Sequence, residues 1–215
     1  MTAYLLLLDA GPESCAAMSA VPARTQAHKL RRGFYQEPAD ALARALIGKI
    51  LVHRTGQKEY RGRIVETEAY MGPNDLASHS SKGRTKRTEV MFGPAGHAYV
   101  YFIYGMYEMF NIVAGTTGKA HAVLVRAAEP MDGWEADLSG PGKLARAFEL
   151  KRSDNGLDLT GSKLFLLDNP GDQAKIAVSP RIGIDYAKHW VSAPLRFFDA
   201  NSPAVSKTRS APPKR

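Results

Sequence analysis

The sequence predicts an α+β fold with a largely antiparallel sheet in a single domain. Short runs of β-branched and aromatic residues alternate with glycine-bearing turns, a pattern typical of strands joined as hairpins. Helical and extended segments follow one another without the regular alternation of a Rossmann-type fold. The 215 residues, 44% of them hydrophobic, are enough for one sizeable core, and neither a repeat nor a linker divides residues 33–203.

Local composition predicts each element in turn. Residues 39–47 are rich in helix formers and place Leu42, Ala45 and Leu46 on one face, before Gly48 ends the helix. A second helix is predicted over 143–151, after a Ser-Gly-Pro-Gly turn. Strands are predicted over 50–53, 60–70, 98–114, 122–127, 164–167, 176–178 and 195–198. Gly105 is expected to break the long aromatic segment into a hairpin with Tyr104 at its tip.

Charge and cysteine content limit the class of protein. Lys and Arg exceed Asp and Glu by eight, and the pI of about 9.6 favours a polyanionic partner, nucleic acid first and an anionic membrane second. Cys15 is the single cysteine, which excludes an internal disulfide framework and a thiolate zinc cluster and indicates a reducing compartment.

The two ends of the chain differ in composition from the middle. Residues 1–30 predict a poorly ordered leader, residues 31–203 the domain, and residues 204–215 a basic tail, within a disordered stretch expected from Asn201 onward. The apolar run at 4–8 is far below the roughly 20 residues that span a bilayer, and no basic residue precedes it as in a signal peptide. We therefore expect an intracellular protein, cytoplasmic or nucleoid-associated, without a membrane partner.

The strand predicted over 60–70 carries the first candidate site. Its period of two puts Ile64, Glu66, Glu68 and Tyr70 on one face. A solvated strand face is the commoner explanation of an isolated glutamate pair. Here, however, the pair is followed by a histidine and by a basic run that resembles a phosphate-contacting loop, namely His79 and then Lys82, Arg84, Lys86 and Arg87.

The aromatic segment 99–111 carries the second candidate site. Aromatic strands often pack in cores, so from this segment alone a core strand and a ligand-binding strand are equally open. A hairpin tip formed by Tyr104, Gly105 and Met106 could wedge into a base stack, with Tyr101 pointing from the sheet face. Asn111 is either a satisfied structural amide, the commoner case, or a group that contacts a ligand's edge.

The third candidate is Arg126, at the end of an apolar strand. It either pairs with a glutamate structurally or, if it lies beside Glu68, holds that carboxylate ionised or orients a water. The histidines lack zinc-ligand spacing, and neither a phosphate loop nor a Gly-x-Ser-x-Gly elbow occurs. We expect no metal, no cofactor and no nucleophilic serine.

Several motifs in one order, spanning about residues 34–204, resemble the alkyladenine (3-methyladenine) DNA glycosylase family of the mammalian type, found also in bacteria. They are ALARALIG at 41–48, GRIVETEAY at 62–70, MF at 91–92, YVYFIYGMY at 99–107, SGPGKL at 139–144, PRIGI at 180–184 and PLRF at 194–197. The segment 130–139 is shorter than in the mammalian enzymes, and the loop 115–121 differs in length, so DNA contacts there do not transfer.

The resemblance implies one compact domain with a curved antiparallel sheet and flanking helices. It also implies a monomeric, monofunctional DNA glycosylase of base excision repair, which hydrolyses the N-glycosidic bond of flipped alkylated or deaminated purines in double-stranded DNA. Glu68 corresponds to the general base for the attacking water, and Arg126 and the main-chain carbonyl of Ile182 correspond to groups that hold that water.

The remaining roles also come from the resemblance. Tyr70 and Tyr101 correspond to the rings that sandwich the flipped base, and His79 lines the same pocket. Asn111 corresponds to the wall that disfavours guanine, and Tyr104 to the side chain that fills the gap in the duplex. Arg84, Lys86 and Arg87, with the hairpin residues Gly105 and Met106, are the further candidate DNA-binding residues.

Two other functions stay open. The principal alternative is a non-catalytic, damage-recognising or architectural DNA-binding module with the same wedge and basic surface. A third is an RNA-binding protein or a nuclease, although a nuclease normally clusters carboxylates around a divalent ion, and the sequence contains no convincing set.

Overall fold

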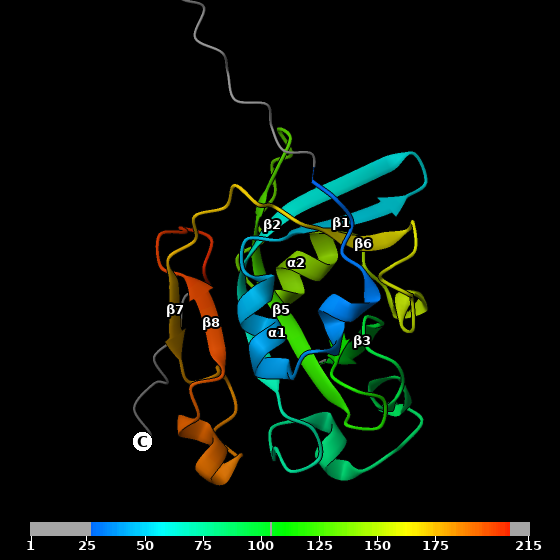
Figure 1. Ribbon diagram of the computed structural model, residues 1–215, viewed down its shortest axis with the longest axis vertical. Helices are drawn as coiled ribbons and strands as arrows, with labels where there is room; N and C mark the ends of the chain where they lie inside the picture. The colour runs from blue at the N-terminus through cyan, green and yellow to red at the C-terminus, as the bar shows by residue number, and fades with distance from the viewer. Residues whose placement is uncertain (1–26, 104, 207–215) are drawn as a thin grey trace, which may run out of the picture.

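A curved antiparallel sheet of eight strands forms the centre of the computed structural model, which describes residues 27–103 and 105–206 (Figure 1). Six strands lie in the order β3-β4-β5-β2-β1-β6, and β8 pairs with both β2 and β7. The predicted α+β class with a curved, largely antiparallel sheet is confirmed. The strands are β1 (Ile50–Thr55), β2 (Lys58–Tyr70), β3 (Ala98–Ile103), β4 (Tyr107–Ala114), β5 (His121–Pro130), β6 (Leu164–Leu167), β7 (Ile176–Ser179) and β8 (Arg196–Asp199).

Two α-helices pack on the sheet: α1 (Ala39–Leu46) against β2 and β5, and α2 (Pro141–Ala147) against β4 and β5. Residues of both helices belong to one hydrophobic core, which makes the described chain a single domain. The buried face of α1 consists of Ala39, Leu42, Ala43 and Leu46, whereas Ala45, predicted on that face, is exposed.

The second helix is shorter than the sequence predicts. It ends at Ala147 rather than at 151, because Glu149 adopts a positive φ of 55°, which is incompatible with a continuing right-handed helix. Short 3-10 helices, which the sequence did not predict, complete the loops: η1 (Arg32–Gln36), η2 (His79–Lys82), η3 (Glu89–Phe92), η4 (Arg152–Asp154) and η5 (Lys188–Ser192).

β2 changes partners along its length. It pairs with β1 up to Arg63, with β8 from Glu66 to Glu68, and on its other side with β5. The β2–β5 register shifts between Ile64 and Thr67, a bulge that bends the strand where β8 replaces β1.

The bulge also changes which side chains share a face. Thr67 points to α1, where its hydroxyl donates to the carbonyl of Ala43. Ile64 joins the main core, so the predicted alternation that grouped it with the two glutamates is wrong at this position. Glu66 and Glu68 both contact Arg126 on the other face.

The aromatic segment folds into the predicted hairpin of β3 and β4. Ile103 pairs with Tyr107 at its end, and Gly105 takes the positive φ of 67° that the turn requires. Tyr104, predicted at the tip, lies outside the described residues.

Both ends of the described chain contact the sheet. The amide of Leu30 donates to the carbonyl of Leu166 in β6, so residues directly before the predicted domain start already contact the fold. At the other end, residues 201–206 pack back beyond the predicted onset of disorder, and Ser206 is buried against β2. Among the described residues, no helix combines the length and apolar character needed to cross a membrane.

Candidate active site

A cavity of about 250 Å³ opens between the end of β2, the β3–β4 hairpin and the loop before η5. It collects aromatic and polar side chains from distant segments, among them Tyr70, His79, Tyr99, Tyr101, Asn111, Arg126, Ile182 and Tyr186. A larger and more open hollow of about 980 Å³ lies near residues 28–34. Two of the cations that line it, Lys49 and Arg32, are paired with aspartates. The smaller cavity is the better candidate site, because aromatic and polar side chains converge on it.

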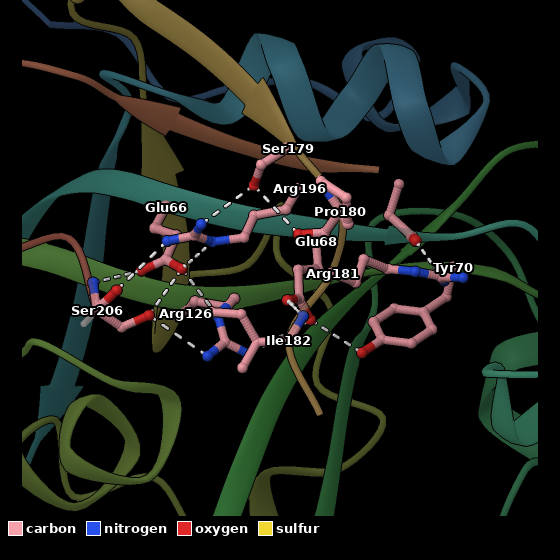
Figure 2. A network of polar contacts seen from close by, with 11 residues as sticks. Glu66, Glu68, Tyr70, Arg126, Ser179, Pro180, Arg181, Ile182, Arg196 and Ser206 are labelled. Carbon is pink, nitrogen blue, oxygen red and sulfur yellow. Dashed lines mark hydrogen bonds and ion pairs between the residues drawn. The ribbon is translucent and has the colours of Figure 1, made fainter. Parts of the chain in front are cut away.

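Glu68 lies directly behind the wall of this cavity. Its carboxylate is fully buried and contacts three residues of the wall (Figure 2). Oε1 accepts a hydrogen bond of 2.8 Å from the backbone amide of Ile182. Oε2 accepts one of 3.0 Å from the Tyr70 hydroxyl and lies 3.3 Å from Nη1 of Arg126. The structure thus brings Glu68, Arg126 and Ile182 together, and the Ile182 group that touches Glu68 is the amide. The predicted role of the Ile182 carbonyl, to hold the attacking water, stays a prediction.

Arg126 lies between two carboxylates. Its Nε donates to Oε1 of Glu66 at 3.0 Å while Nη1 faces Glu68. Arg126 therefore pairs with a glutamate and also lies beside Glu68, and its predicted role toward Glu68 stays a prediction. Burial alone would lower the pKa of Arg126, but the charges of Glu68 and Glu66 outweigh it and raise that pKa above its usual value. The guanidinium therefore stays positive beside Glu68.

The aromatic part of the wall includes the partly buried rings of His79 and Tyr101 and the buried ring of Tyr99. Tyr101 contacts His79 edge to face at a centroid distance of 4.4 Å and Tyr99 at 5.3 Å. Nδ1 of His79 lies 2.9 Å from the Tyr99 hydroxyl. Tyr99 was not among the predicted site residues, although the period of two along its strand puts it on the face of Tyr101 and could have indicated it.

Burial fixes the protonation of these groups. It lowers the pKa of His79 to about 4, helped by the positive charge of Arg87, so the imidazole is neutral at pH 7. Burial likewise raises the pKa of Tyr70 and of Tyr101 far above the usual value, which keeps both phenols protonated. The wall is therefore uncharged apart from Arg126.

An arginine guanidinium lies over each of the two rings, Tyr70 and Tyr101, that are predicted to stack on the flipped base. The guanidinium of Arg181 lies 4.8 Å from the centroid of Tyr70, and that of Arg87 lies 5.2 Å from the centroid of Tyr101. Arg181 is fully buried and forms a two-bond pair with Asp75, which also accepts hydrogen bonds from the Met71 and Ala77 amides. The sequence did not predict this pair, because its members are 106 positions apart and only the fold joins them.

Asn111 lines the cavity from β4 and is 3% exposed. Its Nδ2 donates to the carbonyl of Tyr99 at 3.2 Å. The amide nitrogen thus has a structural partner, and the side chain also forms part of the cavity wall.

The predicted DNA-binding residues that the structure describes lie on the surface, whereas Tyr104 lies outside the described residues. Arg84, Lys86 and Arg87 are exposed in the loop after η2, although Arg84 is 3.0 Å from the carboxylate of Glu89. Met106 is 64% exposed at the hairpin, beside exposed Gly105. Within residues 27–103 and 105–206, no three His, Cys, Asp or Glu side chains gather where they could hold a metal ion.

Comparisons with known proteins identify the family of this chain. The model of a family described as methylpurine-DNA glycosylase matches residues 33–203. The match places the chain among the DNA glycosylases, hydrolases that act in DNA repair. Relatives from Legionella pneumophila (strain Lens), Anaeromyxobacter dehalogenans (strain 2CP-1) and Myxococcus xanthus (strain DK1622) are each 48% identical and each named as a 3-methyladenine DNA glycosylase. The alignments cover 84%, 83% and 86% of this chain and 99%, 86% and 96% of the relatives. The chain belongs to the methylpurine-DNA glycosylase family, as the resemblance predicted.

Proposed function

We propose that this protein, acting as a monomer, removes alkylated and deaminated purines from double-stranded DNA by hydrolysing the N-glycosidic bond of a flipped nucleotide. The observation that carries the proposal is the buried carboxylate of Glu68, paired with Arg126 behind a wall that contains Tyr70 and Tyr101. The product is an abasic site in an intact strand.

The aromatic wall suits an extruded purine. Rotating a nucleotide out of the stack costs a few kcal/mol, which new stacking contacts must offset. Tyr70 and Tyr101 supply ring faces, and their phenols are neutral. The imidazole of His79 is also neutral, so it adds no positive charge to the wall. A purine made cationic by alkylation gains about 0.5–2 kcal/mol from each ring face that it meets.

Glu68 suits the hydrolytic step. As the glycosidic bond breaks, the sugar gains oxocarbenium character, and a nearby carboxylate both stabilises that charge and takes a proton from the attacking water. Because Glu68 is fully buried, water reaches it only when one of its contacts opens. The Tyr70 hydroxyl is the uncharged side-chain partner, so its hydrogen bond is the contact whose loss costs least.

The exposed surface beside the cavity suits a duplex. Arg84, Lys86 and Arg87 offer charges to phosphates without reading sequence. Met106 and the neighbouring exposed rings of Phe102 and Tyr107 offer apolar contacts to unstacked bases. Binding should weaken as salt rises.

The decisive experiment is a panel of duplexes, each with one lesion, scored for free base and for alkali-sensitive abasic sites. The panel holds 3-methyladenine, 7-methylguanine, hypoxanthine and ethenoadenine, with an RNA duplex and an undamaged duplex beside them. Glu68→Gln should bind the lesion duplexes yet release no base. Glu59→Gln, the same change at an exposed position of β2, is the matched control and should act like the wild type.

Two outcomes would replace the proposal. Lesion-selective binding without base release by the wild type would favour the non-catalytic module. Cleavage of phosphodiester bonds, or a preference for the RNA duplex, would favour the third function. Full activity of Glu68→Gln would remove Glu68 from the catalytic role.

A further inference from the structure

Behind Glu68 lies a second buried carboxylate, that of Glu66, which no step of the proposed reaction uses (Figure 2). Its Oε1 accepts hydrogen bonds from Nε of Arg126 at 3.0 Å, from Nε of Arg196 at 2.6 Å and from the Ser206 hydroxyl at 2.7 Å. Its Oε2 accepts from the backbone amide of Ser206 at 2.7 Å. Four donors from three separate segments thus converge on one side chain.

These contacts determine how Arg126 meets Glu68. Glu66 accepts a hydrogen bond from Nε of Arg126, and the Ser206 hydroxyl oxygen accepts one from Nη2 at 3.4 Å. Only Nη1 faces Glu68, at 3.3 Å. Arginine otherwise tends to bind a carboxylate through two parallel bonds. Glu66 and Ser206 thereby hold the guanidinium so that only one of its nitrogens faces Glu68. Oε1 of Glu68 therefore remains free to accept the hydrogen bond from the amide of Ile182.

The network reaches Glu68 from its other side as well. Nη1 of Arg196 donates to the Ser179 hydroxyl at 3.1 Å, and Nη2 donates to the carbonyl of Ser206 at 3.3 Å. The Ser179 hydroxyl in turn donates to the carbonyl of Pro180, two residues before the amide that binds Glu68. Figure 2 shows Arg196, Ser179, Pro180 and Ser206 around the two glutamates.

The charges of the cluster also balance. Glu66 and Glu68 carry two negative charges, and Arg126 and Arg196 carry two positive ones, all at most 8% exposed. A buried charge is tolerated only when it is paired and hydrogen-bonded. Without Glu66, only the carboxylate of Glu68 would remain to balance the charges of these two guanidiniums.

We propose that Glu66, Arg196 and Ser206 are positioning residues, which hold Arg126 and through it Glu68 in the geometry that the hydrolysis needs. The chain segment 201–206 is then a functional part of the active centre rather than the start of a tail. This inference rests on the proposed function, and the alternative is that the cluster only fastens this segment to the sheet.

The kinetic test compares Ser206→Thr with Ser206→Val in the full chain, because the two side chains have nearly the same shape and differ in the hydroxyl. The probe is a duplex with one ethenoadenine, or another lesion that the wild type processes, with enzyme in excess. We expect base release by the Val variant to be about 10-fold slower than by the Thr variant, with dissociation constants within about twofold of each other. The same pair at exposed Ser192 is the control and should show no difference.

A second measurement does not depend on catalysis. The Nε proton of Arg126, assigned by its loss in Arg126→Lys, is followed by NMR of protein with ¹⁵N-labelled arginine. Its exchange with solvent should be slow in the wild type and in Ser206→Thr, and about 10-fold faster or more in Ser206→Val and Glu66→Gln, as expected when a protecting contact opens. Should either Ser206 variant fail to fold, Ser206→Ala removes the hydroxyl without adding atoms.

Equal rates for the Thr and Val variants overturn the proposal, as does equal exchange of the Arg126 proton. Equal rates with altered exchange would show that the network holds Arg126 without serving the reaction. If the wild type releases no base but its Arg126 proton exchanges more slowly than that of Ser206→Val, the proposed function is contradicted. The positioning of Arg126 by this network would still stand.

Discussion

The hydroxyl of Tyr70 donates a 3.0 Å hydrogen bond to Oε2 of Glu68, two residues earlier on the same face of β2. One side chain thus contributes a ring to the cavity wall and a hydroxyl to the carboxylate behind it. The two contributions can be separated by substitution.

Tyr70→Phe should keep base binding and keep base release. The ring that stacks remains, and removing the hydroxyl only uncovers an oxygen of Glu68 that water must reach. We expect the dissociation constant for a lesion duplex and the single-turnover rate to stay within about threefold of wild type, whereas Tyr70→Leu should weaken binding by about 1–3 kcal/mol through the lost stacking. A Phe variant that binds but does not turn over would show that the phenol takes part in the chemistry.

Arg126→Gln should destabilise the fold strongly. It leaves two fully buried carboxylates, those of Glu66 and Glu68, without the charge that pairs with both. Breaking a buried pair in this way costs about 3–5 kcal/mol in the free energy of unfolding, measured by urea denaturation at pH 7. Arg61→Gln removes an arginine that is 40% exposed and paired with Glu59, so it should cost at most about 1 kcal/mol. Similar losses for both variants would contradict the charge balance described above.

His79 should make stability depend on pH between about 4 and 6.5. Burial lowers its pKa in the folded protein to about 4, so over this range the unfolded chain binds a proton that the folded chain does not. The stabilisation is present above pH 6.5 and is lost as the pH falls towards 4.

His79→Gln removes this titration while keeping a polar group near Tyr99. Between pH 7 and 4.5, the wild type should lose about 1–2 kcal/mol more unfolding free energy than the variant, a figure reduced from the full shift because His79 is only partly buried. Parallel losses in urea denaturation at the two pH values would show that the imidazole is not held neutral.

Local sequence patterns predicted the parts of the site that lie on single elements. Glu68 and Tyr70 follow from the alternation of one strand, and the hairpin around Gly105 follows from glycine in an aromatic segment. The bulge in β2 was not predictable, because the change of partner from β1 to β8 causes it and no local pattern marks that change.

The contacts between residues far apart in the sequence could not be predicted either. Arg196 lies 130 positions from Glu66, and Ser206 lies 140 positions from it in a stretch whose composition predicts disorder. A serine in a polar tail looks the same in the sequence whether it is solvated or bound to a buried carboxylate. Only the paths of β8 and of residues 199–206 in three dimensions reveal the difference.

Arg87 and Lys86 should separate phosphate binding from support of the aromatic wall. Both are exposed cations in the same loop, but of the two it is Arg87 that lies over a ring of the wall, that of Tyr101 at 5.2 Å. Binding of a lesion duplex is measured against salt concentration, and each lost phosphate contact should reduce the slope of log K against log salt by about 0.9. Lys86→Gln should change that slope and leave single-turnover base release unaltered. Arg87→Gln should change the slope equally and also slow base release, because Tyr101 and His79 lose the cation that packs against this part of the wall. Identical kinetics for the two variants would mean that the contact with Tyr101 has no part in holding the flipped base.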